Sequence, residues 1–235
     1  MMPTAAILAG GAATRLYPAT RKVAKSMLEV AGRPFIDHQL DLLRRGGVGS
    51  VVICSGCLGG QIKEHVGDGS RFGLSVRFSD DGDRPLGTGG ALKKALPLLG
   101  GDFFVMYGDS YLPVSFGGVA AAYRAAGRPG LMTVYRNGGK WDRSNVLFRG
   151  GEIVRYDKTA SDRDMEHIDY GLGVLSPEAF GQFSDRDAFD LAEVYAALIA
   201  SKGLFGLEVT ERFYEIGSPQ GLVETDAYLS GLKER

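Results

Sequence analysis

The chain has 235 residues, of which 44% are hydrophobic and 23% charged, and its formal net charge is −1. This composition is ordinary for a globular protein and differs from that of disordered or fibrous chains. A chain of this length can bury a core that needs neither a disulfide nor a structural metal. Because acidic and basic residues balance, the sequence offers no broad basic face and argues against nucleic acid as a partner.

Two features bear on the cellular compartment. The N-terminus does not have the basic and apolar segments of a signal peptide, and no apolar run approaches the ~20 residues that span a bilayer. We therefore expect a cytoplasmic protein with no membrane partner. The two cysteines, Cys54 and Cys57, suit a reducing compartment, and no second pair completes a zinc site. Because Cys54 ends the apolar run 51–53, it is expected to be a buried strand residue.

Short apolar runs alternate with segments of helical periodicity along the first half of the chain. This alternation predicts βαβ units and a mainly parallel sheet with helices on both faces. The expected strands are Ala5–Ala9, Val51–Cys54, Leu74–Phe78, Phe103–Tyr107 and Leu131–Tyr135. The expected helices run from Phe35 to the Gly46-Gly47 pair, from Thr88 to a stop near Pro97, and from Val119 to Ala126.

The pattern changes after about residue 140. Residues 145–148 and 152–156 flank a glycine turn and predict a β-hairpin. A further strand is expected over 170–175, and two helices over 191–201 and 219–233, with short strands near 207–209 and 213–216. No repeat or linker divides the chain. We therefore expect one α/β domain over residues 1–235, with a small substrate-facing β subregion in its second half.

A glycine-rich loop follows the first expected strand. In open α/β sheets, ligands bind at this carboxyl end of a parallel strand. Gly10 and Gly11 permit close approach of the backbone to a ligand, and Arg15 and Lys25 add cationic groups suited to phosphate. The spacing matches neither G-x-G-x-x-G nor the P-loop. The alternative to a ligand-binding loop is a basic loop that is merely solvated. Triphosphate binding is favoured because the cationic residues follow the glycine loop directly.

The run LAGGAATRLYPATRKVAKSMLEV (8–30) resembles the signature of the sugar-phosphate nucleotidyltransferases, L-A-G-G-x-G-T-R-L followed by a proline–lysine pair. PLGTGGAL (85–92) is similar to the base-side loop of that family, and Tyr107-Gly108-Asp109 to its G-D metal motif. Asp157-Lys158 resembles its acidic–lysine pair at the sugar phosphate. EIGSP (215–219) resembles the D-x-G-[TS]-P element that carries the second metal ligand. The run 85–96 most resembles bacterial enzymes for heptose, glucose or N-acetylmuramic acid 1-phosphates.

The resemblance implies a Rossmann-like, glycosyltransferase-A-like fold. It also implies transfer of a nucleoside monophosphate from a nucleoside triphosphate (NTP) to a sugar 1-phosphate, with Mg²⁺ as cofactor and pyrophosphate as product. Residues up to about 135 would bind the nucleotide, and residues from about 136 to 235 would bind the sugar and supply the second metal ligand. A homodimer formed through the core domain stays open.

The same resemblance implies roles for individual residues. Asp109 and Glu215 would ligate Mg²⁺, Arg15 would clamp the β- and γ-phosphates, and Lys25 would neutralise charge at the α-phosphate. The nucleotide-binding set would be Leu8, Ala9, Gly10, Gly11, Thr14, Pro85, Gly87, Thr88 and Gly89. The sugar-phosphate set would be Asn145, Asp157, Lys158, Asp169 and Gly171. The histidines His38, His65 and His167 show no metal-ligand spacing and are expected to be structural.

Three residues depart from the family pattern. Ala13 stands where the family has glycine, Ala24 replaces the proline before Lys25, and Glu215 replaces an aspartate. These departures keep a non-catalytic nucleotide- or sugar-phosphate-binding relative open as an alternative. A second alternative is a cytidylyltransferase for a phospho-alcohol such as phosphocholine, whose pocket would need an aromatic cage. The identities of the nucleotide and the sugar stay open, because a shared fold does not determine them.

Overall fold

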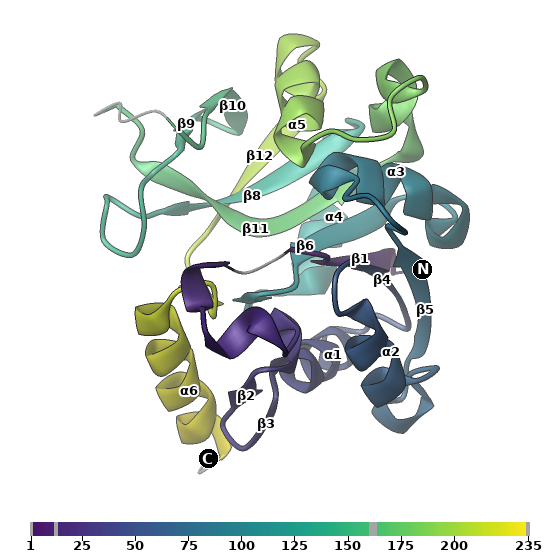
Figure 1. Ribbon diagram of the computed structural model, residues 1–235. Helices are drawn as coiled ribbons and strands as arrows, with labels where there is room; N and C mark the ends of the chain where they lie inside the picture. Colours follow the sequence, from purple (N-terminus) through teal and green to yellow (C-terminus); the bar gives the residue numbers. More distant parts are fainter. Residues whose placement is uncertain (1, 12–13, 160–163, 234–235) are drawn as a thin grey trace.

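The computed structural model describes residues 2–11, 14–159 and 164–233, which are built around a nine-stranded sheet (Figure 1). The strand order is β5-β4-β1-β6-β11-β8-β12-β10-β9. These strands are β1 (Thr4–Ala9), β4 (Ser50–Ser55), β5 (Ser75–Asp80), β6 (Phe103–Tyr107), β8 (Gly130–Arg136), β9 (Val146–Arg149), β10 (Glu152–Tyr156), β11 (His167–Leu175) and β12 (Leu204–Val209). Two small sheets pair β2 (Glu29–Val30) with β3 (Arg33–Pro34) and β7 (Ser110–Tyr111) with β13 (Tyr214–Glu215).

The sheet is parallel in its first part and mixed in its second. Strands β5, β4, β1 and β6 are parallel neighbours, as the βαβ pattern predicts. Beyond them, β11 runs antiparallel to both β6 and β8, and β10 runs antiparallel to β9 and β12, whereas β12 is parallel to β8. The prediction of a mainly parallel sheet therefore describes only the first half. From β8 to β11 the chain passes through four strands without a helix between them, and such connections reverse the strand direction.

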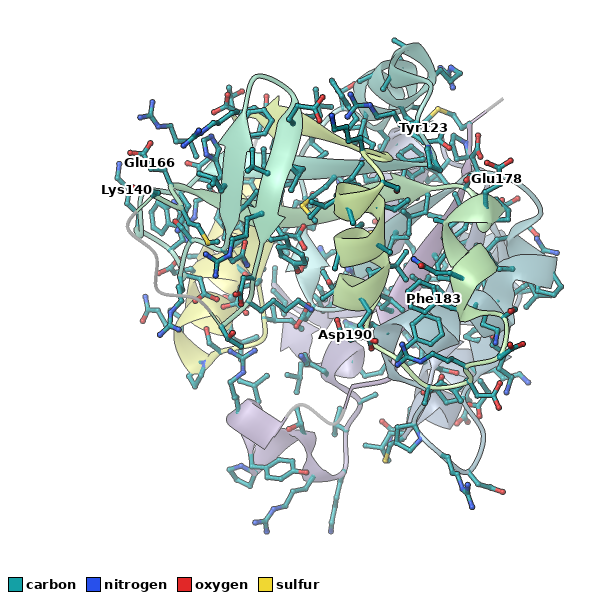
Figure 2. The ribbon with its side chains drawn as sticks, turned by 90° about the horizontal axis from the view of Figure 1, so that it is seen from above. Tyr123, Lys140, Glu166, Glu178, Phe183 and Asp190 are labelled. Carbon is teal, nitrogen blue, oxygen red and sulfur yellow. The ribbon has the colours of Figure 1, made fainter. Side chains whose placement is uncertain are left out.

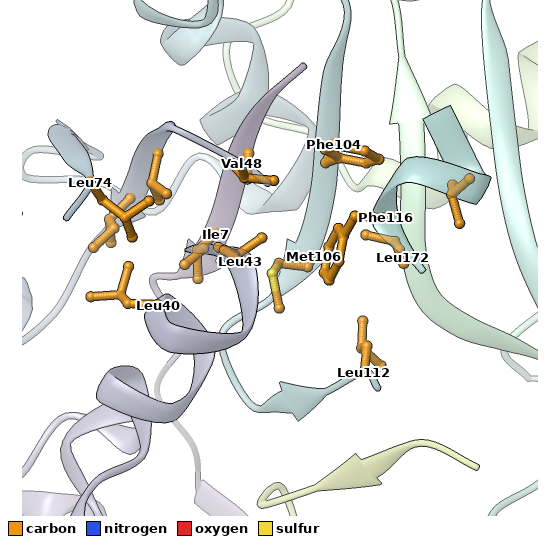
Figure 3. Close-up of a cluster of buried hydrophobic side chains, with 14 of the residues drawn as sticks. Ile7, Leu40, Leu43, Val48, Leu74, Phe104, Met106, Leu112, Phe116 and Leu172 are labelled. Atoms are coloured by element: carbon orange, nitrogen blue, oxygen red, sulfur yellow. The ribbon is translucent and has the colours of Figure 1, made fainter. Parts of the chain in front are cut away.

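Helices cover both faces of the sheet, as predicted. They are α1 (Phe35–Arg45), α2 (Gly59–Val66), α3 (Gly87–Leu99), α4 (Phe116–Ala126), α5 (Leu191–Ala200) and α6 (Pro219–Lys233). In β1, Ile7 faces a core shared with α1, α2 and α4 (Figure 3), whereas its neighbour Ala6 faces a core shared with α3 and α5. Successive strand residues point to opposite faces, so both faces of β1 are buried and its sequence is continuously apolar.

Three helical predictions need correction. Helix α3 continues through Pro97 to Leu99, although Pro97 has no N–H to donate to the carbonyl of Lys93. Helix α3 begins at Gly87, one residue before the expected start at Thr88, and its N-cap position is Leu86. Helix α4 begins at Phe116, three residues earlier than expected, where the Ser115 side chain accepts a hydrogen bond from the Gly118 N–H. Helix α2 was not predicted, because its eight residues bury little apart from Ile62 and Val66.

A third, smaller core anchors the C-terminal helix. Ile216 and Leu229 are buried with Val30, Phe35 and Tyr111. Figure 1 shows α6 lying beside the β2–β3 pair, far along the chain from it. The pairing of β13 with β7 sets Glu215 opposite Ser110, so this core brings the C-terminal region to the residue that follows Asp109.

Among the residues that the structure describes, no helix is long and apolar enough to cross a membrane. Cys54 is buried in β4, as predicted. The rings of His38, His65 and His167 contact Val30 O, the Asp37 carboxylate and the Glu208 carboxylate. The described part of the chain holds no cluster of three or more His, Cys, Asp or Glu residues suited to a metal.

Candidate active site

A cavity of about 510 Å³ opens at the carboxyl ends of β1, β4 and β6. Strand β4 lies on one side of β1 and β6 on the other. The loop after β1 therefore lies where the strand order reverses, which is where open α/β sheets bind ligands. The lining residues are Leu8, Ala9, Gly10, Gly11, Lys25, Ser26, Cys54, Gly56, Cys57, Asp81, Gly82, Asp83, Pro85, Gly87, Thr88, Ala91, Tyr107, Gly108 and Asp109.

Most of the predicted nucleotide-binding set lines this cavity, and Gly89 does not. Gly89 is buried against the Phe189 ring, where a Cβ would lie 2.4 Å from a ring carbon, so it serves helix packing instead. Thr14 begins the short 3₁₀ helix Thr14–Leu16. Ala13, one of the departures from the family pattern, lies outside the described residues.

Residues 187–191 contact the first turn of α3 through hydrogen bonds and close packing. The backbone N–H groups of Gly89 and Gly90 donate to Phe189 O at 2.9 and 3.2 Å. The Thr88 hydroxyl accepts a hydrogen bond from the Leu191 N–H at 2.8 Å. Gly87, at φ +70°, packs so closely that a Cβ would lie 2.5 Å from Phe189 O. The cavity wall formed by α3 therefore depends on contacts about one hundred residues away in the sequence.

Lys25 and Asp109 form an ion pair at the inner end of the cavity. Lys25 Nζ lies 2.8 Å from Asp109 Oδ2, and the two side chains are only 19% and 24% exposed. The neighbouring Ser26 hydroxyl donates to Gly108 O at 2.7 Å, which joins the lysine segment to the end of β6. The pair thus presents one cation and one carboxylate to any ligand in the cavity, partly shielded from solvent.

Gln61 of α2 holds the segment before Lys25 in place. Its Oε1 accepts a hydrogen bond from the Ala24 N–H at 2.9 Å, and its Nε2 donates to Lys22 O at 2.7 Å. A proline at position 24 would have no N–H to donate. The amide of Gln61 therefore provides the support for Lys25 that a proline would otherwise give. Sequence reasoning missed this residue, because nothing in the local pattern links α2 to residues 22–24.

Glu215 brings a second carboxylate next to Asp109. The Ile216 N–H donates to Asp109 O at 2.9 Å, and a Cβ placed on Gly217 would lie 2.7 Å from Glu215 Oε2 and 3.1 Å from Asp109 Oδ2. Arg15 Nη2 lies 3.8 Å from the same point. Two carboxylate oxygens this close belong to the donor set that Mg²⁺ takes in proteins, which waters and phosphate oxygens complete.

The predicted sugar-phosphate residues lie next to this cavity but do not line it. Lys158 Nζ lies 6.0 Å from the ring centres of Tyr107 and Tyr156 and 3.2 Å from Asp190 Oδ1. Asp190 is the N-cap residue of α5 (Figure 2). Gly171, at φ +93°, approaches Tyr107 so that a Cβ would lie 3.6 Å from its ring. Tyr107 thus links the nucleotide cavity to the sugar-phosphate residues.

The other three members of that set have protein partners. The half-buried Asp169 carboxylate accepts hydrogen bonds from the Tyr156 hydroxyl at 3.1 Å and from the Gly171 N–H at 3.0 Å, and its removal from solvent raises its pKa. Asn145 Oδ1 accepts from the Asp169 N–H at 2.9 Å. Asp157 accepts from the Thr159 N–H and from Arg155. The side chains of these three residues are therefore held in place by protein partners.

The acidic stretch after β5 is a further part of the cavity that sequence reasoning missed. Asp81 and Asp83 line it, and Asp81 Oδ2 accepts a hydrogen bond from the Leu86 N–H at 3.2 Å. Partial burial raises the pKa of the Asp81 carboxyl. The sequence feature that could have indicated them is their position between the end of a strand and the loop at Pro85.

The two cysteines differ sharply in accessibility, and we expect alkylation to reflect this. Burial raises the pKa of the Cys54 thiol to about 12, so at pH 8 only about one in ten thousand is thiolate. Cys57 is exposed at the cavity. Iodoacetamide at pH 8 should therefore modify Cys57 alone, as read by peptide mass spectrometry, and nucleoside triphosphates should slow the reaction. Labelling of Cys54 in the folded Cys57→Ser variant would contradict this expectation.

Comparison with known proteins agrees with this fold. The model of the nucleotidyl transferase family matches residues 4–140, which is more than half of the chain. The chain therefore belongs to the nucleotidyl transferase family.

Two curated relatives and one solved structure illustrate the relationship. The chain is 39% identical, over 52% of its length and 52% of the relative, to the N-acetylmuramate alpha-1-phosphate uridylyltransferase of Neisseria meningitidis. It is 31% identical, over 97% of its length and 65% of the relative, to a mannose-1-phosphate guanyltransferase of Eremothecium gossypii. The chain thus spans between half and two thirds of these relatives. The crystal structure of HddC from Yersinia pseudotuberculosis shares the fold, with a TM-score of 0.80, 20% identity and coverage of 97% and 100% of the two chains.

Proposed function

We propose that this chain is an enzyme that transfers a nucleoside monophosphate from an NTP to a sugar 1-phosphate and releases pyrophosphate. The observation that carries the proposal is that the Lys25–Asp109 ion pair lines a glycine-rich cavity, with Glu215 and Arg15 next to Asp109. The curated relatives named above act on N-acetylmuramate and mannose 1-phosphates, which supports the same class of substrate. We place the reaction in the cytoplasm, in the synthesis of nucleotide sugars for cell-envelope polysaccharide.

The site residues divide the reaction among them. Mg²⁺, held by Asp109 and Glu215, would supply charge neutralisation for the phosphates. The glycine loop after β1 receives the triphosphate through backbone N–H groups, and α3 and residues 81–85 enclose the base. An oxygen of the sugar phosphate attacks the α-phosphorus, and the bond to the bridging oxygen breaks as pyrophosphate leaves. Lys25 neutralises charge at the α-phosphate, Arg15 stabilises the leaving pyrophosphate, and Lys158 holds the incoming phosphate.

The surroundings of Lys158 favour a sugar over choline as the acceptor. The rings of Tyr107 and Tyr156 face the Lys158 ammonium, with Nζ 6.0 Å from each ring centre. A quaternary ammonium needs such aromatic faces for itself and would be repelled by a lysine already placed there. Hydroxyl groups of a sugar carry no charge and can bind beside it.

The test is a substrate panel. The protein is incubated with Mg²⁺, inorganic pyrophosphatase, each of five NTPs (ATP, CTP, GTP, UTP and dTTP) and each of several sugar 1-phosphates. We expect phosphate release for one NTP–sugar pair, and its loss by at least ~10³-fold in Asp109→Ala. Equal release by the wild type and Asp109→Ala would refute the assignment of this site. Silence across the panel, with nucleotides still bound, would favour the non-catalytic relative.

A further inference from the structure

Gly221 lies in the first turn of α6 and is in unusually close contact with Glu215. A Cβ at this position would lie 1.8 Å from Glu215 Oε1, 2.5 Å from its Cδ and 2.6 Å from its backbone O. Glycine within a helix is less favourable than alanine, because it loses more conformational freedom on folding. The position therefore bears a local cost, and the contact with Glu215 accounts for it.

The carboxylate of Glu215 is folded back against the start of α6 and fixed there. Oε1 accepts a hydrogen bond from the Ser218 hydroxyl at 2.6 Å, and Oε2 accepts one from the Gly217 N–H. Ser218 Oγ in turn accepts from the Gly221 N–H at 3.0 Å. The Thr225 hydroxyl donates to Glu215 O at 2.8 Å, which fixes the backbone at this point. These bonds leave Oε2 on the side of Asp109.

A glutamate carboxylate lies one methylene further from the backbone than that of an aspartate. Glu215 lies in β13, so its longer side chain must bend if its carboxylate is to lie beside that of Asp109. The space it occupies is the space in which residue 221 would otherwise carry its side chain. Any larger residue at 221 would force Glu215 to turn away, and it would then lose its bonds to Ser218 and Gly217.

We propose that Gly221 is a positioning residue that gives the long side chain of Glu215 the space to place its carboxylate beside that of Asp109. The inference rests on the proposed function, in which Glu215 is the second metal ligand. It explains how this chain accommodates glutamate at that position. It also predicts that residues 215 and 221 are energetically coupled, whether or not a metal is bound.

The coupling is tested by thermal unfolding without metal. Gly231→Ala is the matched control, because Gly231 lies in the same helix and a Cβ there meets nothing within 4 Å. We expect that substitution to raise the unfolding midpoint by about 2 °C, and Gly221→Ala to lower it by about 5 °C or more. In a Glu215→Asp background, the loss caused by Gly221→Ala should be smaller, because the contacts with the glutamate carboxylate are removed and only the contact with the backbone O persists. Equal losses in the two backgrounds would overturn the proposal.

Metal binding is tested separately with Mn²⁺ alone, titrated and followed by electron paramagnetic resonance. Gly221→Ala should weaken Mn²⁺ binding about tenfold, and Gly231→Ala should leave it unchanged. Coupled stabilities together with unchanged Mn²⁺ affinity in Gly221→Ala would overturn the positioning role and leave the proposed function intact. Unchanged Mn²⁺ affinity in Glu215→Ala would instead refute Glu215 as a ligand, and with it the metal assignment of the proposed function.

Discussion

Lys25→Ala is expected to lower the kcat of nucleotidyl transfer by about 10²- to 10³-fold, with a much smaller change in the Kd for the NTP. Lys25 Nζ lies 2.8 Å from Asp109 Oδ2, and the side chain is only 19% exposed. Its charge therefore acts where solvent screening is weak, at the inner end of the cavity. Alanine would leave the Asp109 carboxylate without its cationic partner and the α-phosphate without a neutralising group. The measurement is steady-state pyrophosphate release, with NTP binding followed by calorimetry.

Lys22→Ala is the matched control for this prediction. Lys22 lies three residues earlier and is exposed, and its backbone O rather than its ammonium is held by Gln61. We expect this variant to retain nearly the wild-type kcat. Similar losses in both variants would mean that the general positive charge of the segment matters, and not the placement of Lys25. A Lys25→Ala effect confined to KM would assign the lysine to substrate binding rather than to the transition state.

The parts of the site that could be predicted are those in which a local pattern determines position. A parallel strand followed directly by Gly10 and Gly11 places a loop at the carboxyl edge of the sheet, and the cavity is there. Asp109 follows the apolar strand β6, which ends at Tyr107 beside β1, so it reaches the same edge. In both cases the fold needed only the strand order to bring the residues together.

The supporting contacts could not be predicted, because they join segments that are distant in sequence. Gln39 of α1 donates hydrogen bonds to Tyr107 O and Ser110 O, and so holds the turn that carries Asp109. Thr88 meets the Leu191 N–H 103 residues away. A glutamine in a helix and a threonine after a glycine carry no sign of such partners. The orientation of the Glu215 carboxylate could not be predicted either, because it depends on the space that is left where Gly221 has no side chain.

The acidic stretch at 81–83 shows a different limit. Its residues precede the recognisable PLGTGGAL run, and they form no motif of their own. The structure places Asp81 at the cavity because β5 is the edge strand of the parallel half, so its carboxyl end meets the ends of β4 and β1. Strand order, which the sequence does not state, decided this outcome.

Gly87→Ala is expected to destabilise the protein by about 2–5 kcal/mol, which is large for a substitution at an exposed helix end. Its φ of +70° costs a non-glycine residue about 1–2 kcal/mol. A Cβ would also lie 2.5 Å from the backbone O of Phe189, and separating α3 from that segment adds about 1–3 kcal/mol. Because Gly87 also lines the cavity, the KM for the NTP should rise in the same variant.

Two further glycines separate these contributions in urea unfolding experiments. Gly100, at the other end of α3, has φ +86° and nothing within 4 Å of a Cβ, so Gly100→Ala should show the backbone strain alone, about 1–2 kcal/mol. Gly60 of α2 has no positive φ and no close contact, and Gly60→Ala should be neutral or stabilising by up to ~1 kcal/mol. The free energy of unfolding lost in Gly87→Ala, minus that lost in Gly100→Ala, then measures how closely residues 187–191 pack against the cavity wall formed by α3. If the two losses are equal, a Cβ at position 87 is accommodated without strain, and the contact with Phe189 O does not require glycine there.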